Sequence, residues 1–97
     1  MDYIRVDKHL ARRIGFVEAA LLSELSTMIA TSGAGEIAIT TAQLIEQTSI
    51  GMGDLVPARA RLESEGLIAA ARDGKSVTRY RVDHVRLAAI WGQRGVM

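Results

Sequence analysis

Apolar residues recur at helical spacing through the first third of the chain. Between Asp7, a residue type that often caps helices, and Gly15, the spacing of the apolar positions predicts a short helix over residues 7–14. A second pattern repeats in steps of three and four residues until a turn-prone run of small residues, 31–35. Its apolar members are Val17, Ala20, Leu21, Leu22, Leu25, Met28 and Ile29. The width of this stripe predicts a largely buried helix.

The period then changes from helical to alternating. Residues 37–40 read Ile-Ala-Ile-Thr, and the alternation of isoleucine with smaller residues is typical of a short strand. Thr40 and Gln43 have the spacing of a capping box, in which the hydroxyl and the amide satisfy free N–H groups at the start of a helix. This spacing predicts a helix over residues 41–48.

A turn through residues 49–53 leads to a further helix, predicted from Asp54 to the residue before Gly66. Asp54 is expected to be its N-cap. Pro57 then falls in the first turn, where its missing N–H has no intrahelical partner to lose. At 100° per residue, the buried side of this helix carries Leu55, Ala58 and Leu62.

The last part of the chain predicts a β-hairpin and one more helix. Two strands, 67–72 and 77–83, flank a loop that begins with Asp73-Gly74, a strong signal for a tight hairpin. Asp83 can also cap a final helix. The apolar residues of that helix are Val85, Leu87, Ala88, Ile90 and Trp91.

Size and composition limit what such a chain can be. It has 97 residues, of which 48% are hydrophobic and 24% charged, so we expect one folded domain over residues 1–97. Cysteine is absent, which removes disulfides, thiolate metal sites and a cysteine nucleophile. No apolar run is long enough to span a membrane, and no signal peptide is recognisable. We therefore expect a soluble, cytoplasmic protein.

Charge is distributed unevenly along the chain. Residues 1–58 carry four basic and seven acidic side chains, whereas residues 59–97 carry eight basic and four acidic ones. Such asymmetry is typical of a protein that places one face against a polyanion. We expect the late cations to form one contiguous surface beside a helix.

The order of the predicted elements, together with two stretches of sequence, resembles a winged helix-turn-helix domain. Residues 39–48, Ile-Thr-Thr-Ala-Gln-Leu-Ile-Glu-Gln-Thr, are similar to the strand and first helix of that motif. Residues 61–68, Arg-Leu-Glu-Ser-Glu-Gly-Leu-Ile, resemble the usual exit from its recognition helix into the wing. The resemblance covers residues 17–82. The opening of the chain, from residues 4–7 (Ile-Arg-Val-Asp) through Leu10 and residues 14–15 (Ile-Gly) to residues 19–22 (Ala-Ala-Leu-Leu), is also similar to winged-helix domains of phage and plasmid replication or partition proteins.

The resemblance implies binding to double-stranded DNA, with the second helix of the pair in the major groove and the hairpin on the backbone. Candidate DNA contacts are Arg59, Arg61, Ser64, Arg72, Lys75, Arg79 and Arg81. The recognition-helix face carries Gly53, Val56, Pro57 and Ala60. These small and apolar side chains cannot make the bidentate contacts by which arginine or asparagine reads bases, and the chain has no asparagine. We therefore expect mostly backbone contacts, in a transcriptional repressor or a replication or partition factor of a mobile element.

Several alternatives remain open. The hairpin arginines could be a solvated edge that prevents strand aggregation, and Arg61 could simply pair with Glu65. The apolar face of the helix that begins at Asp54 also fits a protein-interaction module, such as a phage-encoded inhibitor. Leu87, Ile90 and Trp91 either close the core or form the interface of a homodimer, which is the expectation here.

Nothing in the sequence indicates an enzyme. The two histidines, His9 and His84, are far apart and lie outside any acidic or cysteine cluster, so no metal site is expected. No serine, aspartate or glutamate has the arrangement of a nucleophile with its base. We expect no cofactor.

Overall fold

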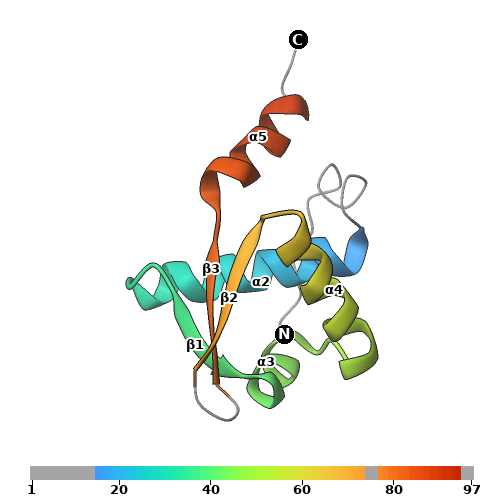
Figure 1. Cartoon of the computed structure of the whole chain (residues 1–97), viewed down its shortest axis with the longest axis vertical. Helices are drawn as coiled ribbons and strands as arrows, with labels where there is room; N and C mark the ends of the chain where they lie inside the picture. The colour runs from blue at the N-terminus through green and yellow to red at the C-terminus, as the bar shows by residue number, and fades with distance from the viewer. Residues whose placement is uncertain (1–14, 74–76, 95–97) are drawn as a thin grey trace.

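The computed structural model describes residues 15–73 and 77–94. The predicted helix over residues 7–14 and the hairpin tip with Lys75 lie outside the described residues. The rest forms an α+β fold that is mostly helical (Figure 1). Its elements are α2 (Phe16–Ser32), β1 (Ile37–Thr40), α3 (Thr41–Thr48), α4 (Met52–Ser64), β2 (Ile68–Asp73), β3 (Val77–Val82) and α5 (His84–Arg94).

The three strands form one antiparallel sheet in the order β1-β3-β2. Along the central strand β3, Thr78, Tyr80 and Val82 are buried, whereas Arg79 and Arg81 are exposed. Because side chains alternate across a strand, the sheet has one face toward the core and one toward solvent. We call the solvent-facing side the outer face.

The core lies between the inner face of the sheet and the helices. Helix α2 crosses behind the strands and packs against α4, whereas α3 packs against β1 (Figure 1). The fully buried side chains are mostly leucine, which suits helices that meet along one apolar stripe. The largest are Leu21, Leu22, Leu25, Leu44, Leu55, Leu62, Leu67 and Tyr80. The predicted buried side of the helix after residue 53 is confirmed, since Leu55, Ala58 and Leu62 are all at most 2% exposed.

The predicted capping box at the start of α3 is confirmed. The amide of Gln43 donates to Thr40 Oγ1 at 3.0 Å, and Gln43 Oε1 accepts from the amide of Thr40 at 3.0 Å. Two donors that would otherwise lack partners are thereby satisfied. The strand 37–40 and the helix 41–48 have their predicted bounds.

Helix α4 begins two residues earlier than the sequence predicts. Gly51 is its N-cap in an extended conformation, and the carbonyl of Gly51 accepts from the amides of Asp54 and Leu55 at 3.0 and 2.8 Å. Asp54 is thus in the first turn instead of capping it. Pro57 lies beyond that turn, so the predicted first-turn position is wrong. Pro57 has no N–H to donate to the carbonyl four residues earlier in the helix. The residue is tolerated because it lies on the exposed side of α4, where water can reach that carbonyl.

The last helix starts where the sequence predicts. Asp83 Oδ1 accepts from the amide of Arg86 at 2.9 Å, which is an N-cap bond. Leu87 is 3% exposed and belongs to the core cluster, so its assignment to a dimer interface is wrong. The backbones of Ile90 and Trp91 belong to α5, but their side chains lie outside the described part. Figure 1 shows α5 extending away from the body of the fold.

Candidate interaction surfaces

A short turn holds α3 and α4 together. Thr48, at the end of α3, is buried; its hydroxyl donates to the carbonyl of Leu44 at 2.8 Å and accepts from the amide of Ile50 at 3.1 Å. Ser49 adopts the left-handed conformation that ends the helix, with φ of 60°. One buried hydroxyl therefore fixes where the chain leaves α3 before it enters α4.

The side of α4 that faces away from the core forms the first candidate surface. We define this α4 face by Met52, Gly53, Val56, Pro57 and Ala60, all of which are exposed. Met52 is 54% and Val56 44% exposed, which is high for side chains of this size. The four residues predicted for the recognition-helix face therefore do lie together at the surface.

Two more predicted residues border the α4 face. Arg61 is exposed, and Ser64 is exposed as well. The Ser64 hydroxyl donates to the carbonyl of Arg61 at 3.0 Å. The Ser64 hydroxyl thus hydrogen-bonds to a backbone carbonyl near the end of its own helix. Arg61 supplies the positive charge at the border of the α4 face.

Arg59 has a different place from the one that the sequence predicts. Its side chain is 7% exposed, and Nη1 donates to Tyr80 Oη at 2.9 Å and to Thr41 Oγ1 at 3.2 Å. The guanidinium therefore joins α4 to β3 and to the start of α3. Its assignment as a phosphate contact is wrong, because the side chain points into the fold instead of along the surface.

The hairpin cations lie on two different sides of the sheet. Arg72 pairs in register with Thr78, whose side chain is on the core side, so Arg72 extends past the core on the side of the helices. Arg79 and Arg81 lie on the outer face. Of the cations expected to form one contiguous surface, strand alternation therefore separates Arg72 from Arg79 and Arg81, while Lys75 lies outside the described residues.

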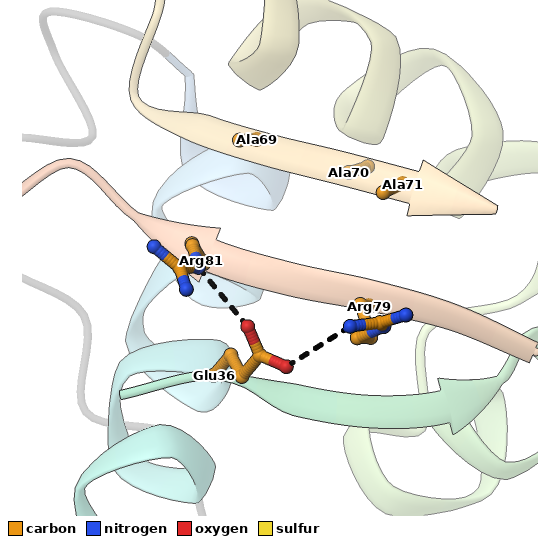
Figure 2. Close-up of a pocket in the computed structure, with 6 residues that line it drawn as sticks. All are labelled: Glu36, Ala69, Ala70, Ala71, Arg79 and Arg81. Carbon is orange, nitrogen blue, oxygen red and sulfur yellow. Dashed lines mark hydrogen bonds and ion pairs between the residues drawn. The ribbon is translucent and has the colours of Figure 1, made fainter. Parts of the chain in front are cut away.

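The arginines of the outer face share one acidic partner from the same chain. Arg81 Nε donates to Glu36 Oε1 at 3.1 Å, and Arg79 Nη1 lies 3.6 Å from Glu36 Oε2 (Figure 2). We call these three residues the Glu36 cluster. The arginine side chains are 47% and 69% exposed, for Arg79 and Arg81 respectively. Ion pairs this open to water stabilise a fold by about 0–1 kcal/mol, so their main effect is to orient the side chains.

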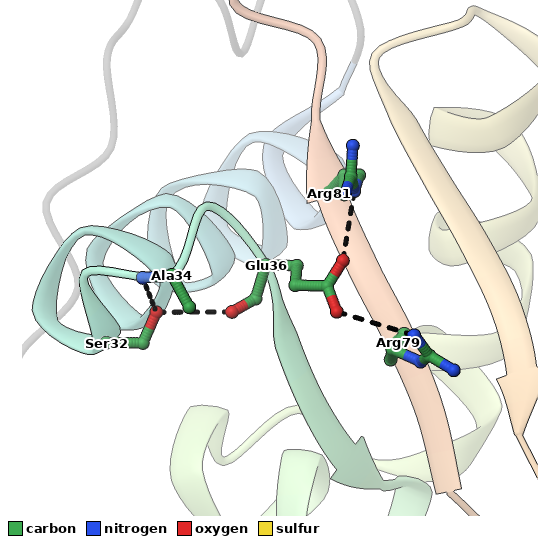
Figure 3. Close-up of polar contacts among 5 residues, drawn as sticks. All are labelled: Ser32, Ala34, Glu36, Arg79 and Arg81. Atoms are coloured by element: carbon green, nitrogen blue, oxygen red, sulfur yellow. Dashed lines mark hydrogen bonds and ion pairs between the residues drawn. The ribbon is translucent and has the colours of Figure 1, made fainter.

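Local bonds hold the backbone of Glu36 in place. Ser32 Oγ lies 2.7 Å from the carbonyl of Ile29 and 3.2 Å from that of Glu36, and it accepts from the amide of Ala34 at 3.2 Å (Figure 3). Gly33 ends α2 in the left-handed conformation, with φ of 70°. The turn after α2 therefore delivers Glu36 to the outer face, directly before β1.

A shallow groove of about 280 Å³ lies beside the Glu36 cluster. Its lining is completed by Ala69, Ala70 and Ala71 on β2 (Figure 2). In register, Ala69 lies opposite Arg81 and Ala71 opposite Arg79. The groove thus has a floor of alanine methyl groups next to two long arginine side chains.

Neither a metal site nor a membrane-spanning helix is present among the described residues. Within residues 15–73 and 77–94, no group of three or more histidine, aspartate or glutamate side chains is placed to hold a metal ion. The helices of the same ranges are too short or too polar to cross a bilayer.

Comparison with known proteins adds no further assignment. No model of a protein family matches the chain, and no curated protein matches it.

Proposed function

We propose that the chain is a winged helix-turn-helix protein that binds double-stranded DNA with α4 and the β2–β3 hairpin. The observation that carries this proposal is the arrangement α3, short turn, exposed α4 and antiparallel hairpin, with strand order β1-β3-β2. In Figure 1, the start of α4 and the loop-side ends of β2 and β3 lie at the same end of the molecule. A duplex at that end can meet a helix in its major groove and a hairpin on its backbone.

The α4 face suits close approach more than base reading. Gly53 and Ala60 let the helix backbone come near the groove, and Val56 can contact the methyl group of thymine. Arg61, at the border of this face, and Arg72 on the hairpin are the proposed phosphate contacts, and Lys75 adds a third cation by its place in the sequence. Three phosphates per protomer predict a slope of about −3 in a plot of log affinity against log salt.

These features favour a binder of modest sequence preference. Such a protein gains selectivity from DNA shape and from two half-sites in a homodimer. A cytoplasmic repressor, or a replication or partition factor of a mobile element, fits this description. The test is fluorescence anisotropy with a random-sequence duplex at low salt. Saturable binding with the stated slope supports the proposal, and the absence of binding rejects it.

A second function is favoured by one specific observation. Met52 and Val56 leave an apolar patch on α4 that is unusual for a DNA-reading helix. The alternative is a protein-interaction module whose partner covers this patch with apolar side chains. The two functions differ in the effect that a charged residue at position 56 has on DNA binding.

A further inference from the structure

We propose that the α4 face recognises the 5-methyl groups of thymine in the major groove. This inference rests on the proposed DNA binding and adds the chemical feature of the duplex that the surface selects. The preferred ligand is then a thymine-rich duplex, and Val56 is the main residue that determines the preference.

The centre of the α4 face has no side-chain donor to offer to a base. At 100° per residue, Gly53, Pro57 and Ala60 lie within about 60° of one another, and all three are exposed. Ser64 falls among them, but its hydroxyl donates to the carbonyl of Arg61 at 3.0 Å. A serine hydroxyl has one hydrogen, so this bond leaves none for a base edge.

The charged side chains of α4 lie away from this centre. Arg61 and Glu63 are exposed, and each lies about 80° from the centre, on opposite borders of the face. Asp54 lies about 100° away. The other arginine of the helix, Arg59, is buried and donates to Tyr80 Oη at 2.9 Å. The bidentate contact by which arginine identifies guanine is therefore not available at the centre of the face.

Thymine is the base that matches such a surface. In the major groove it is the base whose edge carries an apolar group, the 5-methyl group. Val56 is 44% exposed, and Met52, one helical turn earlier, is 54% exposed, so both have apolar area left to bury. The branched valine side chain is stiff, whereas methionine adapts its shape to a neighbouring group. The affinity of this face should therefore rise with the number of thymine methyl groups that it covers.

Small residues at the centre of the face allow the close approach that this contact needs. A Cβ built at Gly53 meets open space, and Ala60 adds a single methyl group. The helix backbone can thus enter the groove without a long side chain that holds it away from the bases. Val56 is then brought within contact distance of a methyl group on the base edge.

The experiment compares two duplexes of the same mixed A·T sequence, one with thymine and one with deoxyuridine in its place. Deoxyuridine lacks only the 5-methyl group, so base pairing and phosphate charge are kept. By fluorescence anisotropy we expect the thymine duplex to bind about fivefold to tenfold more tightly, since each buried methyl group contributes about threefold to fourfold in affinity. The two salt slopes should be equal, because the methyl group is uncharged.

Two matched variants locate the contact. Val56→Ala should reduce the preference for thymine to about twofold, because the alanine side chain is too short to cover the methyl group. Val85→Ala is the same substitution at an exposed valine of α5, and it should leave the preference unchanged.

The outcomes separate this inference from the proposed function. Equal affinities for the two duplexes would overturn the inference and leave DNA binding intact. A full preference in Val56→Ala would also overturn it, because the methyl groups would then be recognised elsewhere. A steeper salt slope for the thymine duplex would overturn it as well, since the preference would then come from phosphate contacts. The absence of binding to either duplex would reject the proposed function itself.

Discussion

Arg59 and Tyr80 are joined by a buried hydrogen bond of 2.9 Å that ties α4 to the central strand. Both side chains are at most 7% exposed. An arginine in this position sets the height and angle of α4 over the sheet, because the same Nη1 also reaches Thr41 at the start of α3. The residue that the sequence suggests as a DNA contact is thus a positioning residue for the two helices.

Replacing Arg59 with methionine is expected to destabilise the fold. The Arg59→Met variant keeps the apolar stem but leaves the Tyr80 hydroxyl buried without its donor, which costs about 1–3 kcal/mol. Urea denaturation measures this loss. In a Tyr80→Phe background the same substitution should cost less, because no hydroxyl is then left unpaired. Equal costs in the two backgrounds would show that the bond contributes nothing.

Leu87 is expected to stabilise the core of a single protomer. Leu87→Ala removes a side chain that is 3% exposed, so it should lower the free energy of unfolding by about 2–4 kcal/mol. Sedimentation of the folded variant should give the same oligomeric state as the wild-type chain. A change of that state with little loss of stability would return Leu87 to the dimer interface.

Alanine substitutions at two glycines should change the stability of the fold in opposite directions. Gly66 has φ of +74°, and a Cβ there would lie 3.0 Å from Nε of Arg86, so Gly66→Ala is expected to cost about 1–2 kcal/mol. Gly53 is in a helix with nothing within 4 Å of an added Cβ, so Gly53→Ala should stabilise by about 0.5–1 kcal/mol. Thermal unfolding measures both. Stabilisation by the Gly66 substitution would contradict the described turn between α4 and β2.

Position 56 distinguishes the two proposed functions of the α4 face. Val56 is 44% exposed, so charged substitutions there should change stability little. If α4 faces DNA, Val56→Arg should strengthen duplex binding about threefold to tenfold and Val56→Asp should weaken it similarly. Anisotropy with one duplex and both variants measures this. Identical affinities for the two variants would favour the protein-interaction alternative.

Much of the fold could be predicted because its signals are local. The capping box at Thr40, the cap at Asp83 and the buried stripe of α4 all depend on residues within a few positions of one another. The start of α4 could not be predicted, because Gly51 caps the helix through its backbone carbonyl, and every residue type has one. Asp54, in contrast, has a side chain that is common at N-caps, and so it gave a misleading signal for the start of the helix.

The interaction surfaces could be predicted only in part. The α4 face followed from helical periodicity. The Glu36 cluster did not, because Glu36 and Arg81 are 45 residues apart and meet only through the pairing of β1 with β3. The alternation along β3 was available as a signal that Arg79 and Arg81 share a face, but not that this face is opposite the helices. Nor does periodicity show that Arg59, at the edge of the apolar stripe, turns inward to Tyr80.

The division of the cations between two sides of the sheet is tested most directly by two double variants of equal charge. Binding of a random duplex is measured for R61A/R72A and for R79A/R81A across a range of salt concentrations. The account predicts that R61A/R72A weakens binding about tenfold and lowers the salt slope by about 2, while R79A/R81A stays within about twofold of wild type. The reverse order of effects would contradict it and place DNA on the outer face.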